Sequence, residues 1–136
     1  MLKTTKGLEP EGITTYVDDK GHEYVRVKMS GEDFCITLHD YARVHQYAFA
    51  WKSVMKLLKE DGLTLFTEKQ VELCADHIDE INNKLKEMGG EAFKNKWYWT
   101  STESNVDTKR AYVYGHGGID NTLKKITLRV RPILNL

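Results

Sequence analysis

Apolar and polar positions alternate with a period of two in the first third of the chain. In the run from 22 to 29, apolar Val25, Val27 and Met29 alternate with Arg26 and Lys28, the pattern of a strand with one buried face. Similar β-rich runs precede and follow it, and polar segments rich in Asp, Ser and Gly separate the runs as turns. The sequence therefore predicts an antiparallel meander of three strands, at 13–17, 22–29 and 34–38, with turns at 18–21 and 30–33.

The spacing of apolar residues changes to three and four in the middle third, which indicates amphipathic helices. One stripe runs through Tyr41, Val44, Ala48, Trp51, Met55 and Leu58. Asp40 is a candidate cap for this first helix, with a shorter version beginning near Gln46, and Gly62 is its expected end.

The second predicted helix has the strongest local signature. Thr67 and Gln70 have the spacing of a capping box, and Phe66 and Val71 have that of a hydrophobic staple. From there one apolar face continues for about five turns, and Gly89-Gly90 is expected to stop it. Its members are Val71, Cys74, Ala75, Ile78, Ile81, Leu85 and Met88.

The last third returns to β-rich runs, at 97–102, 111–114 and 126–133. The polar stretches between them, 103–109 and 115–125, are predicted to be long loops. Strands, two helices and strands again indicate one α+β domain over 1–136. Its parts are an N-terminal β-meander (1–40), two helices (41–90) and a C-terminal β-region (91–136), with the first and last strands expected to meet in one sheet.

The composition of the chain makes some classes of binding partner less expected than others. Twenty basic and twenty acidic residues give a formal net charge of zero over 136 residues, so no overall field favours nucleic acid or anionic lipid. The first twelve residues lack the apolar centre of a signal peptide, and no apolar stretch is long enough to span a bilayer. We expect a cytoplasmic or virion-associated protein without nucleic-acid or membrane partners, and its oligomeric state stays open.

Several short strings, taken in order, resemble a bacterial and phage group within the C-type-lectin-like fold. That group includes relatives of formylglycine-generating enzyme and the variable proteins of diversity-generating retroelements. The strings are Leu65-Phe66-Thr67-Glu68, Ile81-Asn82, Met88-Gly89-Gly90, Trp97 to Glu103, Ala111-Tyr112-Val113 and Arg129 to Ile133. The resemblance covers the chain from about Ala48 onward and implies two helices packed on antiparallel sheets, with the terminal strands close together.

The resemblance also implies a function. In such domains the aromatic strand and the Arg-Pro strand are scaffold, and the loops between them present the ligand surface, here 103–109 and 112–125. Long polar loops on a rigid sheet are where binding residues concentrate. The expected function is a non-catalytic module that binds a protein or glycan. The candidate ligand-binding residues are Asn105, Asp107, Tyr112, Tyr114, His116, Asp120 and Asn121.

Two groups of residues could form metal-ion sites, but each group also has an ordinary structural explanation. Glu103, Asn105 and Asp107 place oxygen donors at alternate positions, which suits calcium, but a solvated loop explains them better and we expect no cofactor. Cys35, His39, Cys74 and His77 include pairs with zinc-like spacing. Because Cys74 lies on the apolar stripe of the second helix, buried free thiols are the simpler interpretation.

Catalysis finds little support in the sequence. Formylglycine-generating enzymes act through cysteines near the C-terminus, and no cysteine follows Cys74. The alternatives to a binding module are an enzyme or zinc-dependent protein that uses the Cys/His set, and a structural subunit of a phage particle. Arg131 is expected to be partly buried, with Glu103 as a carboxylate partner for it or for Arg129.

Overall fold

The computed structural model describes residues 11–39, 51–93, 98–103, 110–115, 118–123 and 130–136. These residues form a mixed α+β protein with two antiparallel sheets. The elements in chain order are β1 (Gly12–Val17), β2 (Glu23–Met29), β3 (Glu32–Thr37), α2 (Trp51–Glu60), α3 (Glu68–Asp76), α4 (Ile78–Glu87), β4 (Tyr98–Glu103), β5 (Arg110–Gly115), β6 (Gly118–Leu123) and β7 (Ile133–Asn135).

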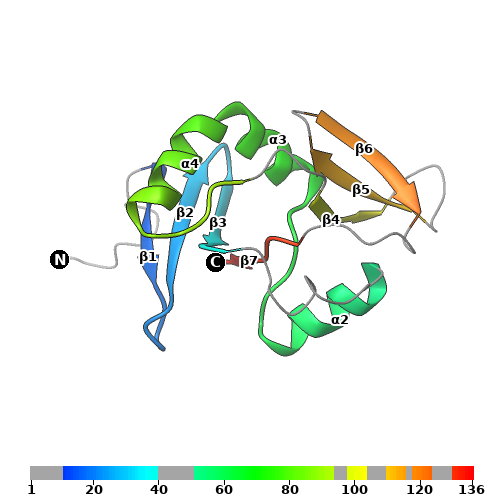
Figure 1. Cartoon of the computed structure of the whole chain (residues 1–136), viewed down its shortest axis with the longest axis horizontal. Helices are drawn as coiled ribbons and strands as arrows, with labels where there is room; N and C mark the ends of the chain where they lie inside the picture. The colour runs from blue at the N-terminus through cyan, green and yellow to red at the C-terminus, as the bar shows by residue number, and fades with distance from the viewer. Residues whose placement is uncertain (1–10, 40–50, 94–97, 104–109, 116–117, 124–129) are drawn as a thin grey trace.

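The first sheet has the strand order β1-β2-β3-β7, and the second has the order β4-β5-β6. Figure 1 shows the two sheets at opposite ends of the molecule, with α3 between them and α4 over β1 and β2. Strand β7 pairs with β3, so that Ile133 lies opposite Ile36. The predicted meeting of N-terminal and C-terminal strands in one sheet is therefore confirmed.

Both turns of the N-terminal meander follow from their residues. At the first turn the Gly21 amide donates to Asp18 O and the Asp18 amide donates to His22 O, and Gly21 has a φ of 85°. This is a three-residue hairpin loop that closes with a glycine bulge. At the second turn Ser30 and Gly31 have φ values of 54° and 81°, the double positive φ of a two-residue hairpin.

The predicted helix ends are confirmed where the structure describes them. Helix α2 ends at Glu60 and is terminated by Gly62. The Leu63 amide donates to Leu58 O and the Gly62 amide to Lys59 O, which are the paired bonds of a Schellman motif. Helix α3 begins with the capping box of Thr67 and Gln70. The predicted start of the first helix, at Asp40 or Gln46, lies outside the described residues.

The prediction of one five-turn helix after Thr67 is wrong, because the helix is broken at His77. This residue ends α3 and precedes α4, with φ −125° and ψ 26°. Beyond the core that they share, the two helices lie against different strands, since α3 contacts β4 whereas α4 contacts β1 and β2. The apolar stripe, which is continuous in the sequence, therefore packs against parts of two sheets.

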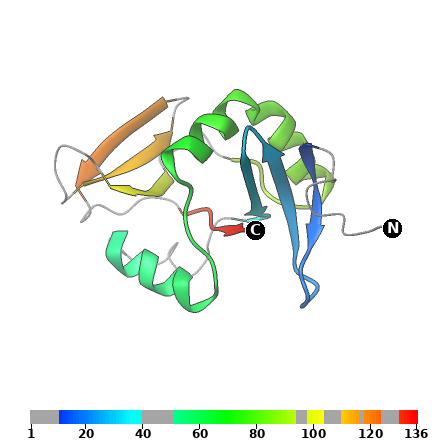
Figure 2. The ribbon, with the colours of Figure 1, turned by 180° about the vertical axis from the view of Figure 1, so that it is seen from behind.

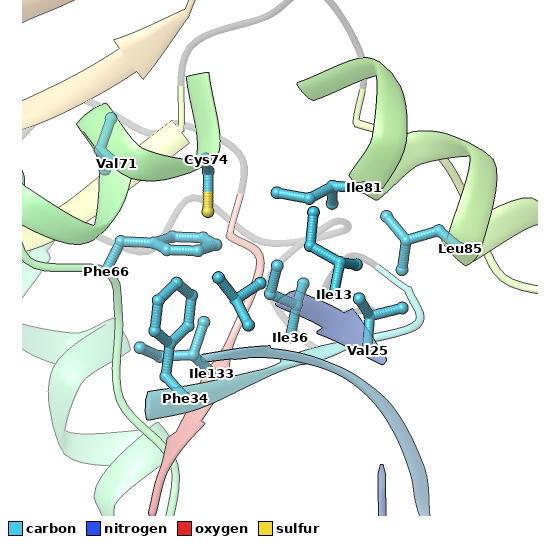
Figure 3. Close-up of a cluster of buried hydrophobic side chains, with 11 residues drawn as sticks. Ile13, Val25, Phe34, Ile36, Phe66, Val71, Cys74, Ile81, Leu85 and Ile133 are labelled. Atoms are coloured by element: carbon cyan, nitrogen blue, oxygen red, sulfur yellow. The ribbon is translucent and has the colours of Figure 1, made fainter. Parts of the chain in front are cut away.

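The larger hydrophobic core lies between the first sheet and the helices α3 and α4. Figure 3 shows Phe34, Ile36 and Ile133 of the sheet facing Phe66 and Cys74, while Ile13 and Val25 face the helix residues Ile81 and Leu85. The Phe34 and Phe66 rings meet edge to face, with 6.1 Å between centroids. The predicted apolar face of the meander is therefore the core face.

A second, smaller core holds α2 against the C-terminal region. Trp99 is its largest member and is fully buried, and the other buried residues are Val54, Leu58, Leu65 and Val130. Seen from behind in Figure 2, α2 lies below the second sheet, on the side away from α4.

The C-terminal third departs from the predicted strand pattern in two places. Most of the predicted loop at 115–125 is strand β6, which pairs with β5 along its whole length. The predicted strand at 126–133 is wrong for Val130 to Pro132, which are irregular, and β7 begins only at Ile133. Arg131 and Pro132 therefore precede the strand and are not part of it. Their expected role as scaffold residues does not depend on a strand conformation.

Candidate functional site

The predicted ligand-binding residues fall into two groups. Tyr112 and Tyr114 lie in β5, and Asp120 and Asn121 lie in β6, so the structure brings these four together in one hairpin. The other three, Asn105, Asp107 and His116, lie outside the described residues.

The strand register divides the four hairpin residues between the two faces of the sheet. Tyr112 lies opposite Asn121, and Val113 lies opposite Asp120. Consecutive residues of a strand belong to opposite faces, and directly opposed residues share a face. Tyr112, Tyr114 and Asn121 therefore belong to one face and Asp120 to the other.

Strand β4 fixes this hairpin to the body of the protein. Tyr98, Trp99 and Thr100 are all buried. The Tyr98 ring meets Phe93 edge to face with 5.4 Å between centroids, whereas Trp99 packs in the smaller core with α2. Because successive residues of β4 are buried on opposite faces, the strand is held from both sides.

Backbone hydrogen bonds tie β4 to the start of α3. The Ser101 amide donates to Phe66 O at 2.7 Å, and the Ser101 hydroxyl donates to the same oxygen at 3.1 Å. This hydroxyl therefore helps to hold β4 against the segment that leads into α3.

Arg131 joins the C-terminal segment to two other parts of the chain. Its side chain is fully buried. The guanidinium donates to Thr37 O at 3.2 Å and to Glu91 O at 3.0 Å, and it lies 4.6 Å from the centroid of the Phe93 ring. The expected burial of Arg131 is confirmed, and it is complete. The pairing of Arg131 with Glu103 stays a prediction, because the Glu103 side chain lies outside the described part of the structure.

Gly90 permits the approach on which this arrangement depends. A Cβ atom at Gly90 would lie 2.7 Å from Leu38 O and 2.8 Å from Leu38 Cβ. With no side chain there, the Glu91 amide reaches Leu38 O at 2.7 Å. The turn after α4 is thereby held against the end of the first sheet, where Arg131 reaches both segments.

The two cysteines are free and buried, as predicted. Burial raises the pKa of the Cys35 thiol to about 12 and raises the pKa of the Cys74 thiol even more strongly. Cys74 packs in the larger core with Phe66 and Val71. A thiol that stays protonated at neutral pH is a poor nucleophile.

The predicted Cys/His set does not assemble. All four residues are described, and in the described part of the chain no three His, Cys, Asp or Glu side chains lie close enough together to hold a metal ion. His39 instead contacts Glu91, with 3.3 Å between Nδ1 and Oε1, and His77 occupies the helix break. The zinc interpretation therefore gains no support from the positions of these side chains.

A pocket that the sequence did not indicate lies beside the β1–β2 turn, and no residue of β5 or β6 is among its lining residues. It has a volume of about 840 Å³ and lies between the β1–β2 turn, the end of α2 and the last residues of the chain. Tyr16, Asp18 and Glu60 are among its lining residues. Its walls come from segments far apart in sequence, so only the polar cluster Asp18 to Tyr24 could have pointed to it.

Asp18 holds the β1–β2 turn, which forms one wall of this pocket, through several hydrogen bonds. Its carboxylate accepts hydrogen bonds from the Lys20 and His22 amides, both at 2.9 Å, and from the Tyr24 hydroxyl at 2.9 Å. Desolvation acts to raise the pKa of Asp18, but the hydrogen bonds from His22, Tyr24 and Lys20 together lower it to about 2. The same environment raises the pKa of Tyr24 to about 12, through desolvation and its bond to Asp18.

The lowered pKa of Asp18 predicts a pH-dependent contribution to stability. Since the folded pKa lies below the ordinary value of 3.8, the contribution is present above about pH 4 and is lost as the pH falls toward 2. We expect Asp18→Asn to lower the Tm at pH 6, and the difference from the wild type to shrink between pH 4 and pH 2. Thermal melts followed by circular dichroism measure this, with Asp76→Asn as the exposed control; a difference that is constant with pH would contradict it.

These features define a mixed α+β protein in which the β5–β6 hairpin pairs with strand β4, whose first three residues are buried, and in which a pocket lies beside the β1–β2 turn. Comparison with protein-family models finds no match to the chain. Comparisons with curated proteins and with solved structures likewise find no significant match. No helix within the described residues is both long enough and apolar enough to cross a membrane.

Proposed function

We propose that the protein is a non-catalytic binding module that presents its C-terminal β-region to a protein or glycan. The observation that carries this proposal is the construction of the second sheet. The first three residues of β4, Tyr98 to Thr100, are buried, while β6 is the edge strand on the other side of β5. A hairpin that is rigidly held at one edge can offer residues to a ligand at little cost in conformational entropy.

The shifted titratable groups argue against acid–base or thiol chemistry. Catalytic groups have pKa values moved toward the working pH. Within the described residues, the pKa values of Asp18, Tyr24 and Cys35 are moved to about 2, 12 and 12, away from neutrality. Each of these groups is thereby fixed more firmly in its resting protonation state, as expected of structural positions.

The resemblance to C-type-lectin-like domains supports the same class of function through the strings around Trp99 and Arg131. Their observed roles, a buried aromatic residue and a buried arginine, fit the scaffold positions that the resemblance assigns to them. We therefore propose a C-type-lectin-like fold, which agrees with the mixed α+β architecture of the protein.

A triple variant tests the proposed ligand surface on the β5–β6 hairpin. We expect Tyr114→Ala, His116→Ala and Asp120→Ala together to weaken binding to a glycan or surface-protein ligand at least about tenfold, because a loss near 1.4 kcal/mol is modest for the centre of a binding surface. The ligand is first found by screening the wild-type protein on glycan and surface-protein arrays. The far-ultraviolet circular dichroism spectrum should be unchanged.

Separate variants identify which face binds. Tyr112→Ala with Asn121→Ala changes one face, and Asp120→Ala changes the other. A matched control with Glu72→Ala and Asp76→Ala, both exposed on α3, should bind like the wild type. If the triple variant keeps full affinity, the ligand surface lies elsewhere.

A further inference from the structure

We infer that the pocket beside the β1–β2 turn, hereafter the hairpin pocket, binds a lysine or arginine side chain of a partner protein. Its volume of about 840 Å³ lies within the usual range of ligand pockets, roughly 300–1,000 Å³. Its walls come from the β1–β2 hairpin, from the end of α2 with Leu63, and from Leu134 and Leu136.

The charge of the lining favours a cation. Four carboxylates line the hairpin pocket, against the ammonium group of Lys20 and the imidazole of His22. The whole chain has a formal charge of zero, so acidic groups are locally concentrated here. Asp19 on the hairpin and Glu60 on α2 are both exposed, and they approach the space from different walls. Carboxylates are ionised at neutral pH, so together they attract a positive group.

The apolar part of the lining selects an organic cation over a metal ion. Leu63, Leu134 and Leu136 also face the hairpin pocket, and Leu136 is 41% exposed. Long basic side chains lay an aliphatic stem on apolar surface and keep the charged head beside polar groups. A metal ion would need convergent ligands, and within the described residues no three carboxylate, thiol or imidazole side chains gather closely enough to hold one.

The hairpin wall is formed before any ligand arrives. The Asp18 carboxylate fixes the turn through the Lys20 and His22 amides and the Tyr24 hydroxyl. The Tyr16 and Tyr24 rings pack against each other with 6.1 Å between centroids. A preformed wall lowers the entropic cost of binding. Asp18 is therefore a positioning residue, and the cation is expected to meet Asp19 and Glu60.

The hairpin pocket beside the β1–β2 turn is separate from the proposed ligand surface on β5 and β6. The β1–β2 turn and the β5–β6 hairpin lie at opposite ends of the molecule in both views (Figures 1 and 2). A failure of one proposal therefore leaves the other intact, and variants in each region report on that region alone.

Nitrogen-15 chemical-shift titration tests the inference directly. The probes are two acetylated and amidated pentapeptides, Leu-Arg-Leu-Arg-Leu and Leu-Glu-Leu-Glu-Leu. We expect saturable shifts with the arginine peptide, concentrated in residues 16–24, 60–63 and 134–136, and none there with the glutamate peptide. Raising the sodium chloride concentration should weaken the arginine complex, because exposed ion pairs are screened.

A charge-neutral double variant supplies the decisive comparison. We expect Asp19→Asn with Glu60→Gln to weaken arginine-peptide binding about fivefold, which is the effect of losing two exposed ion pairs. The matched control, Glu72→Gln with Asp76→Asn, makes the same charge change on α3 and should bind within about twofold of the wild type. The triple variant at Tyr114, His116 and Asp120 should also bind the arginine peptide normally.

Three results would overturn the inference. They are the absence of arginine-peptide binding at millimolar concentration, equal shifts with both peptides, and unchanged affinity in the Asp19→Asn and Glu60→Gln variant. Well-dispersed spectra of both double variants ensure that a lost interaction is not a lost fold.

Discussion

Replacing Arg131 with alanine is expected to lower the free energy of unfolding by about 3 kcal/mol. The change removes the donor to Thr37 O and to Glu91 O, and it leaves a cavity beside the Phe93 ring. Buried carbonyl groups that lose a charged donor are costly. Chemical denaturation followed by tryptophan fluorescence measures the effect.

Two further variants separate charge from geometry at this site. Arg131→Lys keeps the charge but cannot reproduce a planar donor that reaches two carbonyl groups and stacks on a ring, so it should recover less than half of the loss. Lys56→Ala, which removes an exposed cation on α2, should change stability by less than about 0.5 kcal/mol. An unfolding midpoint unchanged in Arg131→Ala would reject the structural role of this side chain.

Trp99→Ala should destabilise the protein by about 3–5 kcal/mol, the usual range for a buried tryptophan. Trp99 is fully buried among Val54, Leu58 and Val130. The structure has two hydrophobic clusters, so the loss of amide protection in hydrogen exchange should be greatest in α2 and β4. Phe34→Ala, in the larger core, should instead open β1, β2 and β3.

The milder variant Trp99→Phe serves as the internal control. The Trp99 indole N–H is buried without an acceptor within the described part of the chain, so phenylalanine removes no hydrogen bond seen there. It should therefore cost far less than alanine. If Trp99→Ala and Phe34→Ala opened the same amides to the same extent, the two clusters would behave as one cooperative unit.

The elements that the sequence predicted correctly are those specified by neighbouring residues. The capping box at Thr67 and Gln70 depends on residues three apart, and the turn at Ser30-Gly31 depends on adjacent ones. Gly62 and Gly89 end helices through their own positive φ. The apolar alternation in β2 gave the core face of the first sheet without any knowledge of its partners.

The errors occur where distant contacts decide the structure. Nothing in the spacing around His77 indicates a break, because the apolar stripe continues across it; the two helices nevertheless lie against different strands, β4 for α3 and β1 with β2 for α4. Strand β6 contains Gly118, Asp120 and Asn121, residue types that disfavour strands, and it forms because β5 supplies a full set of pairing partners. Tertiary context overrides local preference in both cases.

The two candidate sites likewise differ in whether neighbouring residues or distant contacts reveal them. A resemblance of short strings was enough to nominate the β5–β6 region, and the structure brings Tyr112, Tyr114, Asp120 and Asn121 into one hairpin. The hairpin pocket could not be predicted, because its walls come together only when the ends of the first sheet and of α2 meet in space.

The pairing of β3 with β7 has a consequence for how the chain acquires its structure. Thr37 and Pro132, whose backbone atoms hydrogen-bond beside this pairing, are 95 positions apart. Until synthesis passes residue 135, the meander has an open strand edge of the kind that recruits other chains. Contacts of such long range also slow the search for the native state. We therefore expect fragments that end before Ile133 to aggregate more readily than chains that include β7.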